Sequence, residues 1–557
     1  MRTDIGRSAP RRFGTAALIA AIVGGSLALL ANWSVRAAAP ASAATFEIPY
    51  SPTNGRVIDV GGSGSLQSAL DSAVPGDTIV LQAGATYKGP FNLPYKPNGK
   101  DWIYVRSSAY DRLPPPGQRV KQSDVASMPR LISGDGGGAA LTTADRAHHF
   151  RFVGISFSPQ PSQFVHALIR IGNADRSEST LPEYIVFDRC DIRSDETVGG
   201  RRGVAMDGRF VAVIDSRITG FKERGADSQG LWAYNTPGPL KIVNNFVEAA
   251  GENILFGGAD PALDGVVPSD IEIRRNHLFK PLEWRRQGWV VKNLLEFKSA
   301  QRVLVEGNIL QNNWAGGQTG YALLITPRNQ DGNAPWTVTQ DIVVRYNRFE
   351  NVAQGVNILG SDDIHPSRRT SRVLIEHNLI LVTDNGGLQQ DRLFQVVAGP
   401  DGVKINNNTG FSKTAFFIAE NEPRAAGFIF DNNIVARGEY GFSGSGSAEG
   451  VGALRDHFIE FDFAKNALVG TRVANYPIDN FFYSNITEIG FVDYAGGNFR
   501  LAATSKLKGA GTDGQDVGAD IDLIDAAIAG SQTVTNDDVK KAPSTKPMPP
   551  SKFKVGS

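Results

Sequence analysis

A short motif that recurs along the chain limits the fold more than any other feature of the sequence. Apolar residues alternate with spacers, and an Asn follows after two polar or small residues. The clearest copies begin at Ile271, Val303, Ile342 and Val373. Alternation with a period of two indicates a strand with one buried face. An Asn at a fixed offset after each strand indicates a turn that repeats in the same place. Such self-similarity predicts a solenoid.

The Asn position can be followed in both directions from these copies. The step between successive positions ranges from 25 residues (Asn408 to Asn433) to 39 residues (Asn308 to Asn347). The shortest step gives the length of a basic coil, and the irregular extra length of the other steps indicates loops inserted into that coil. The ladder positions are Ile155, Cys190, Ser216, Asn245, Asn276, Asn308, Asn347, Asn378, Asn408 and Asn433. We therefore predict ten stacked coils, with the Asn side chains above one another at one corner.

Two kinds of solenoid use a repeat of this form. Leucine-rich repeats have a similar pattern, but with Leu dominating and a period of about 20–29 residues. Here Ile, Val and Phe fill the apolar positions, and no helical segment recurs between the strands. The sequence resembles the pectate-lyase-like superfamily, in which stacked Asn side chains commonly line an inner turn. This resemblance implies an all-β fold, a right-handed parallel β-helix solenoid.

The two ends of the chain differ from the repeats. Within residues 1–44, arginines precede a long apolar run over 14–31, and Ala41-Ser42-Ala43 follows it. This pattern predicts a secretory signal peptide, and the length of the run also suits an uncleaved membrane anchor. Either alternative implies an exported protein that is periplasmic, extracellular or on the cell surface. Residues 530–557 are poor in apolar side chains and predict a disordered tail. This leaves 45–529 as one β-helix domain.

A change of period marks the start of the predicted domain. Residues 65–74 carry a Ser N-cap and an apolar stripe with helical spacing, and they stop at Pro75-Gly76. The end of a solenoid exposes an apolar cross-section, so we expect this helix to cap the N-terminal end. The segment that follows, 75–89, resembles the opening of many secreted β-helix proteins that act on carbohydrates.

Composition restricts the partners. Lys and Arg number 57, as do Asp and Glu, so the formal net charge is zero. No global field attracts nucleic acid or an anionic membrane. We expect no nucleic-acid partner, a monomer, and membrane contact only through an uncleaved N-terminal segment. The single cysteine, Cys190, excludes an intramolecular disulfide.

Aromatic residues gather in one region of the repeats. Four of the seven Trp lie within 284–336, where the longest ladder step shows that loops are inserted. Sugar rings stack on aromatic side chains, and binding pockets add a few polar groups. The predicted substrate-binding residues are Trp284, Arg285, Trp289, Trp314, Tyr321 and Trp336. The alternative is that these loops pack against the flank of the solenoid.

A charged pair lies in the same region. If Leu295 and Phe297 point inward, then Glu296 and Lys298 point outward. Arg328 comes one coil later on the equivalent face. β-Elimination of a uronic acid polymer needs a base for the proton α to a carboxylate and positive charge for the intermediate. A nearby guanidinium disfavours the ammonium form of Lys and makes it a better base. A structural Lys298 paired with Glu296 or Glu272 is the alternative.

The Lys298-Ser299 pair, followed by a ladder coil and then Arg328, is similar to polysaccharide lyase family six, which contains alginate lyases and chondroitin B lyase. The resemblance implies that Lys298 is the base and Arg328 the acid. The family's calcium ligands correspond to Val291 and Asn293 here, so the match is partial. Alternative ligands for a calcium ion are Glu252, Asp260 and Glu296. The expected function is cleavage of an acidic polysaccharide by β-elimination.

Two other functions stay open at this point. The segments 329–332 and 361–363 resemble signatures of polygalacturonases, β-helix hydrolases that use paired Asp side chains. Asp331-Gly332 and Asp362-Asp363 are also ordinary turn sequences. Finally, an exported β-helix can be a non-catalytic envelope or adhesive protein that presents loops on a stiff rod.

Overall fold

The computed structural model describes residues 38–50, 54–383 and 391–531. Most of the predicted signal peptide or anchor (1–44) and nearly all of the predicted tail (530–557) lie outside these residues. None of the helices within the described ranges has the length and apolar character needed to cross a membrane.

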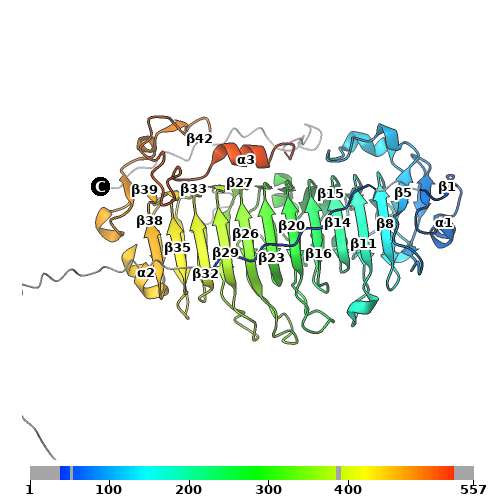
Figure 1. The fold of residues 1–557 in the computed structure, drawn as a ribbon, viewed down its shortest axis with the longest axis horizontal. Helices are drawn as coiled ribbons and strands as arrows, with labels where there is room; N and C mark the ends of the chain where they lie inside the picture. Colours follow the sequence, from blue (N-terminus) through cyan, green and yellow to red (C-terminus); the bar gives the residue numbers. More distant parts are fainter. Residues whose placement is uncertain (1–37, 51–53, 384–390, 532–557) are drawn as a thin grey trace, which may run out of the picture. The chain divides into compact units, whose positions relative to one another are not determined.

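Each coil contributes strands to three parallel sheets, which we name A, B and C (Figure 1). Sheet A has 14 strands: β1 (Val57–Val60), β2 (Thr78–Leu81), β5 (Ile103–Ser107), β8 (His148–Val153), β11 (Glu183–Asp188), β14 (Arg209–Ile214), β17 (Leu240–Val243), β20 (Ser269–Arg274), β23 (Ala300–Glu306), β26 (Thr339–Arg345), β29 (Ser371–Glu376), β32 (Asp401–Asn406), β35 (Phe428–Asp431) and β38 (Phe461–Ala464). Sheet B has 14 strands: β3 (Thr86–Lys88), β6 (Arg130–Ile132), β9 (Ser156–Ser158), β12 (Asp191–Arg193), β15 (Arg217–Phe221), β18 (Phe246–Ala249), β21 (His277–Phe279), β24 (Ile309–Gln311), β27 (Arg348–Val352), β30 (Leu379–Val382), β33 (Thr409–Phe411), β36 (Ile434–Ala436), β39 (Ala467–Val469) and β40 (Phe481–Tyr483). Sheet C has 12 strands: β4 (Phe91–Leu93), β7 (Leu141–Thr143), β10 (Ile169–Ile171), β13 (Arg202–Met206), β16 (Gln229–Ala233), β19 (Glu252–Phe256), β22 (Leu295–Phe297), β25 (Tyr321–Ile325), β28 (Gln354–Leu359), β31 (Arg392–Val397), β34 (Ala415–Glu420) and β37 (Gly441–Gly444).

This architecture is the parallel β-helix predicted from the repeats. The predicted number of coils, ten, was too low, because sheets A and B each hold 14 strands. The inward side chains of all three sheets form one continuous apolar core that runs from Val60 to Tyr476. The coils are thus held together by backbone hydrogen bonds between strands and by burial of this core.

The Asn ladder occupies the corner between sheets A and B, as predicted. Asn276 donates from its backbone N to Asn308 Oδ1 at 2.9 Å and from Nδ2 to Ile242 O at 2.9 Å. The same pattern repeats in every coil from Asn245 to Asn433. The residue before each ladder Asn has a positive φ, from 50° at His377 to 64° at Gly307. A left-handed backbone conformation is unfavourable for most residues. The hydrogen bonds of the Asn side-chain amides stabilise this conformation at the corner.

Helices flank the solenoid. The predicted N-terminal helix is present as α1 (Leu66–Ser72), with Ser65 as N-cap and Leu66, Ala69 and Leu70 buried. Its capping role stays a prediction. The other helices are α2 (Val451–His457), α3 (Ile521–Ala527) and the short 3-10 helices η1 (Tyr110–Arg112), η2 (Gln122–Ser127), η3 (Asp135–Gly137), η4 (Glu178–Thr180), η5 (Leu282–Arg286), η6 (Val473–Asn475) and η7 (Ile486–Ile489). The antiparallel pair β41 (Phe491–Asp493) and β42 (Asn498–Leu501) follows η7.

The C-terminal segment covers the outer face of sheet B. Ile521 and Ile524 of α3 share a buried cluster with Ile309 and Leu379 of sheet B. Gly307 approaches this helix so closely that an added Cβ would lie 2.6 Å from the carbonyl oxygen of Ala527. Figure 1 shows α3 running along the length of the solenoid, beside β27 and β33 of this sheet.

Residues 38–50, which we call the N-terminal strap, cross the outer face of sheet A (Figure 1, dark blue). Ala41 N donates to Asp341 Oδ1 at 2.8 Å, and Ala44 N donates to Asp270 Oδ1 at 2.8 Å. Farther along, Lys241 Nζ donates to the carbonyl oxygen of Phe46 at 2.8 Å. With sheets A and B covered in this way, the outer face of sheet C is the place to search for a site.

Candidate functional site

Two rows of side chains point outward along sheet C. Strand register aligns Arg202, Gln229 and Glu252 in the first row. It aligns Trp232 and Glu296, on either side of Leu255, in the second row. The predicted alternation around Glu296 is correct, since Leu295 and Phe297 belong to the buried core.

Lys298, the predicted base, forms an ion pair with a buried carboxylate. Its Nζ lies 2.8 Å from Glu296 Oε1, and the Glu296 side chain is only 2% exposed. Asn293 Nδ2 donates to the other oxygen of Glu296 at 2.7 Å. Burial acts to raise the pKa of Glu296, but the Lys298 ammonium and the Asn293 amide outweigh it and lower this pKa overall. Lys298 also donates to Thr326 Oγ1 of the next coil at 3.3 Å.

Arg328, the predicted acid, lies on the coil after Lys298. The backbone N of Arg328 donates to the carbonyl oxygen of Lys298 at 2.9 Å, which places the two residues on neighbouring coils as predicted. The guanidinium, however, pairs with Asp362 at 2.6 Å and with Asp363 at 2.9 Å. Lys298 and Arg328 are therefore each neutralised by their own carboxylates.

The residues that resemble polygalacturonase signatures make turn and loop contacts. Asp362 accepts hydrogen bonds from the backbone N of Asn329 at 2.7 Å and of Ile364 at 2.9 Å, in addition to its pair with Arg328. The backbone N of Asp331 donates to Asp260 Oδ2 at 3.0 Å. These contacts fit the turn alternative.

A second buried carboxyl group lies beside Glu296. Glu252 is 2% exposed, and burial together with the charge of Glu296 raises its pKa to about 8. Beneath it, the fully buried Lys280 donates from Nζ to three backbone carbonyls, of Ala249, Ala250 and Gly251, at 2.8–2.9 Å. Burial lowers the pKa of Lys280 to about 7. We call Glu252, Lys280, Glu296 and Lys298 the charged cluster.

The candidate calcium ligands are not gathered at one place. Among the described residues there is no group of three or more His, Cys, Asp or Glu side chains that could hold a metal ion. Asp260 accepts from loop backbone at Asp331 and Asn333, whereas Glu252 and Glu296 lie in the charged cluster beside two lysines. This donor set does not fit a calcium ion, which takes six to eight oxygen ligands.

Most of the predicted substrate-binding aromatics are packed inside loops. Trp284 and Trp314 are buried in one small cluster, with Trp289 partly buried against it. The Arg285 guanidinium lies 5.0 Å from the ring centroid of Trp314. Trp336 donates from Nε1 to the carbonyl oxygen of Val266 at 2.9 Å, and the buried Tyr321 hydroxyl is hydrogen-bonded to Gln395. These contacts are those of the loop-packing alternative.

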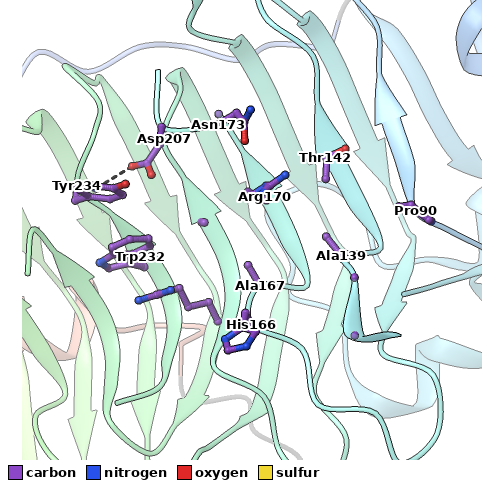
Figure 2. Close-up of a pocket in the computed structure, with 16 residues that line it drawn as sticks. Pro90, Ala139, Thr142, His166, Ala167, Arg170, Asn173, Asp207, Trp232 and Tyr234 are labelled. Carbon is purple, nitrogen blue, oxygen red and sulfur yellow. Dashed lines mark hydrogen bonds between the residues drawn. The ribbon is translucent and has the colours of Figure 1, made fainter. Parts of the chain in front are cut away.

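A cleft of about 660 Å³ lies farther toward the N-terminus on the same face (Figure 2). Its floor is formed by outward side chains of β7, β10, β13 and β16, including Thr142, Arg170, Ala205 and Trp232. Apart from their place in the repeats, the residues of this cleft belong to no motif, and the site was not predicted from the sequence. The only indication of it in the sequence is one outward residue in each strand, such as Arg170 between the inward Ile169 and Ile171.

An aromatic stack forms one end of the cleft. The rings of Trp232 and Tyr234 are stacked with centroids 4.4 Å apart and an angle of 19° between their planes. The Arg202 guanidinium lies 3.9 Å from the centroid of the Trp232 ring. Arg202 Nε also donates to Gln229 Oε1 at 3.1 Å. The stack thus combines apolar ring surface with a fixed positive charge.

The cleft contains two cations that form no ion pair with the described residues. Arg170 is exposed and has neither an ion pair nor a hydrogen bond with the described residues, and Arg202 has no ion pair with them. Asp207 is 6% exposed, and its Oδ1 accepts from the backbone N of Tyr234 at 2.8 Å and of Asn235 at 2.9 Å. Burial raises the pKa of Asp207 to about 6. His166 lies in the same lining.

Comparisons with known proteins support the fold. The sequence matches no family description and no curated protein. The alginate lyase AlyGC, of polysaccharide lyase family six, superimposes with a TM-score of 0.52 at 13% identity, over 88% of this chain and 60% of that one. Pectate lyase Pel9A superimposes with a TM-score of 0.32 at 14% identity, over 84% of this chain and 96% of that one. The family-six lyase Pedsa3628 from Pseudopedobacter saltans superimposes with a TM-score of 0.36 at 13% identity, over 77% of this chain and 93% of that one. The similarity shows a right-handed parallel β-helix, as predicted, and the chain spans about 60% of the length of AlyGC.

Proposed function

We propose that this protein is exported and binds an acidic polysaccharide along the outer face of sheet C. The observation that carries the proposal is the pair of guanidinium groups in the cleft, Arg170 and Arg202, beside the stacked rings of Trp232 and Tyr234. Guanidinium groups bind carboxylates with two hydrogen bonds, and aromatic rings accept the C–H face of a sugar.

The charge pattern of the surrounding coils supports an anionic ligand. The formal net charge of the chain is zero, and many arginines on the solenoid surface pair with carboxylates. Arg302 pairs with Asp270 at 2.8 Å, and Arg328 pairs with Asp362 at 2.6 Å. Arg170 and Arg202 form no ion pair with the described residues, so each guanidinium can pair with a carboxylate-bearing sugar.

A second candidate function is cleavage of the bound polymer by β-elimination at Lys298. The favouring observation is that Lys298 and Arg328 lie on neighbouring coils, with Gln229 joining this region to the cleft through its contacts with Arg202 and Glu252. In this reaction the lone pair of a neutral Lys298 Nζ takes the proton from C5 of a uronate, and a C4–C5 double bond forms. The O4 substituent leaves with the bonding electrons and takes up a proton from water. Lys298 Nζ is paired with Glu296 in the structure, so substrate must separate that pair, and Nζ must have a free lone pair, before Lys298 can act as the base.

Binding is tested by titrating the full chain with hexamers of galacturonate, mannuronate and guluronate, and with neutral cellohexaose. We expect at least one uronate hexamer to bind and cellohexaose to bind at least about tenfold more weakly. Arg170→Gln and Arg202→Gln should each weaken uronate binding about tenfold or more, since each removes charged hydrogen bonds. Arg286→Gln is the matched control, because Arg286 is exposed on η5 and outside the cleft.

Equal binding of neutral and acidic hexamers, or cleft variants that bind like Arg286→Gln, would refute the binding proposal. Cleavage is followed separately, by the ultraviolet absorbance of the unsaturated uronate. Binding without any such product would leave a non-catalytic polysaccharide-binding protein and exclude the lyase candidate for these polymers.

A further inference from the structure

We infer that Asp207 is a specificity-determining residue of the cleft. In its neutral form the carboxyl group donates a hydrogen bond from Oδ2 to the carboxylate of a bound acidic sugar, and in its ionised form it repels that carboxylate. This inference rests on the proposed function, because it assumes that the cleft binds an acidic sugar.

The geometry of Asp207 leaves one oxygen for a ligand. Both of its hydrogen bonds with the described residues go to Oδ1, from the backbone N of Tyr234 and of Asn235, so Oδ2 has no partner there. The residue lines the cleft together with Arg170 and Arg202. Figure 2 shows Asp207 next to Tyr234 at the end of the aromatic stack. A sugar stacked on these rings would therefore meet Oδ2 at its edge.

The charged groups around Asp207 set its protonation. Arg202, from β13, and the two backbone N–H groups favour the ionised form. Burial and the nearby Asp175 disfavour it, and burial is the largest effect, which places the pKa at about 6. The other charged or titratable groups that face the cleft are Arg170, His166 and the phenol of Tyr234, whose pKa is raised by burial and by Asp207. Asp207 therefore changes charge in a range where a uronate carboxylate, with an ordinary pKa of about 3.5, stays ionised.

The sign of the pH effect follows from this order of ionisation. A bound carboxylate stabilises the neutral form of Asp207 and so raises its pKa further. If binding raises this pKa by about one unit, affinity falls about tenfold as the pH rises from about 5 to about 7.5. A neutral hexamer has no carboxylate to accept the hydrogen bond from Asp207. Its affinity should therefore be independent of pH over the same range.

The test is a titration of the full chain with the uronate hexamers between pH 5 and pH 7.5. We expect about tenfold weaker binding at the upper limit for the wild type. Asp207→Asn keeps the shape and the Oδ1 acceptor but stays neutral, so its affinity should be flat and equal to that of the wild type at pH 5. His166→Gln removes the exposed imidazole, and its uronate affinity should fall with pH as that of the wild type does.

Each outcome decides one question. If the uronate affinity of Asp207→Asn still falls with pH, the proposed role of Asp207 is overturned. The same holds if this pH dependence disappears only in His166→Gln. Binding that depends on Arg170 but not on pH overturns the inference and leaves the proposed function intact. Absence of uronate binding at pH 5 refutes the proposed function itself. Thermal melts of each variant verify that it is folded.

Discussion

Gln229 donates a hydrogen bond from Nε2 to Oε2 of Glu252 at 2.8 Å. Its Oε1 accepts from Arg202 Nε at 3.1 Å, so one side chain contacts both the cleft and the charged cluster. Arg202, Gln229 and Glu252 come from successive coils, which are about 4.8 Å apart. A polymer that lies along the solenoid axis would pass from one site to the other without leaving this row.

The protonation of Glu252 should be visible in the stability of the protein. Its folded-state pKa, about 8, is raised above that of an exposed Glu, so the folded state loses stability as the pH rises from about 4.5 to about 8. Glu252→Gln removes this loss. Its melting temperature should match that of the wild type near pH 4.5 and exceed it increasingly up to pH 8. A constant difference across this range would contradict the raised pKa.

Lys298→Arg gives the sharpest test of the lyase candidate. Arginine keeps the ion pair with Glu296 but cannot act as a base, because its pKa stays above about 12. On a polymer that the wild type cleaves, turnover should fall by roughly 10²–10⁴-fold while the melting temperature changes little. Lys465→Arg is the control, since Lys465 pairs with Asp479 far along the solenoid. Unchanged turnover would exclude Lys298 as the base.

Lys298→Ala should do more than remove a base. An outward Lys would ordinarily contribute little to stability, and the sequence alone predicts that folding is barely affected. In the structure its removal leaves the buried Glu296 carboxylate without a cation, which costs about 3–5 kcal/mol. Chemical denaturation measures this loss. Adding Glu296→Gln to the variant should restore most of it.

Asn308→Leu should lower the melting temperature. Asn308 accepts from Asn276 and donates from Nδ2 to Ile273 O and Asn347 Oδ1, both at 2.9 Å. Leucine leaves buried polar groups without partners, at about 1–3 kcal/mol each. Asn333→Leu, in an exposed loop, is the control. Equal melting curves for the two variants would contradict the stabilising role of the ladder.

The fold was predictable because its signal is local and repeats. Each coil carries its own alternating strand and its own Asn. A wrong strand assignment in one coil therefore does not affect the prediction for the next coil. The ladder continues to Asn466 and Asn480, which the sequence analysis missed. The last step, 14 residues, is much shorter than any predicted step, because that coil lacks strands in both sheet C and sheet A.

The site was less predictable because it depends on contacts between coils. Alternation correctly placed Glu296 and Lys298 on the outside, but the partners of Arg328 come from a loop of the next coil, outside the alternating strands. The clustering of Trp in the sequence does not distinguish a groove from loop packing. The cleft combines Arg170, Arg202 and Trp232 from three coils, and no local pattern marks such a combination.

The N-terminal strap implies an order of assembly. Ala41 and Asp341 are separated by 300 residues, yet they share a hydrogen bond. Closing so long a loop costs entropy that a single contact cannot recover, so the strap can dock only once the intervening coils are stacked. The part of the described chain that leaves the ribosome first thus reaches its final position only after the coils as far as Asp341 are stacked.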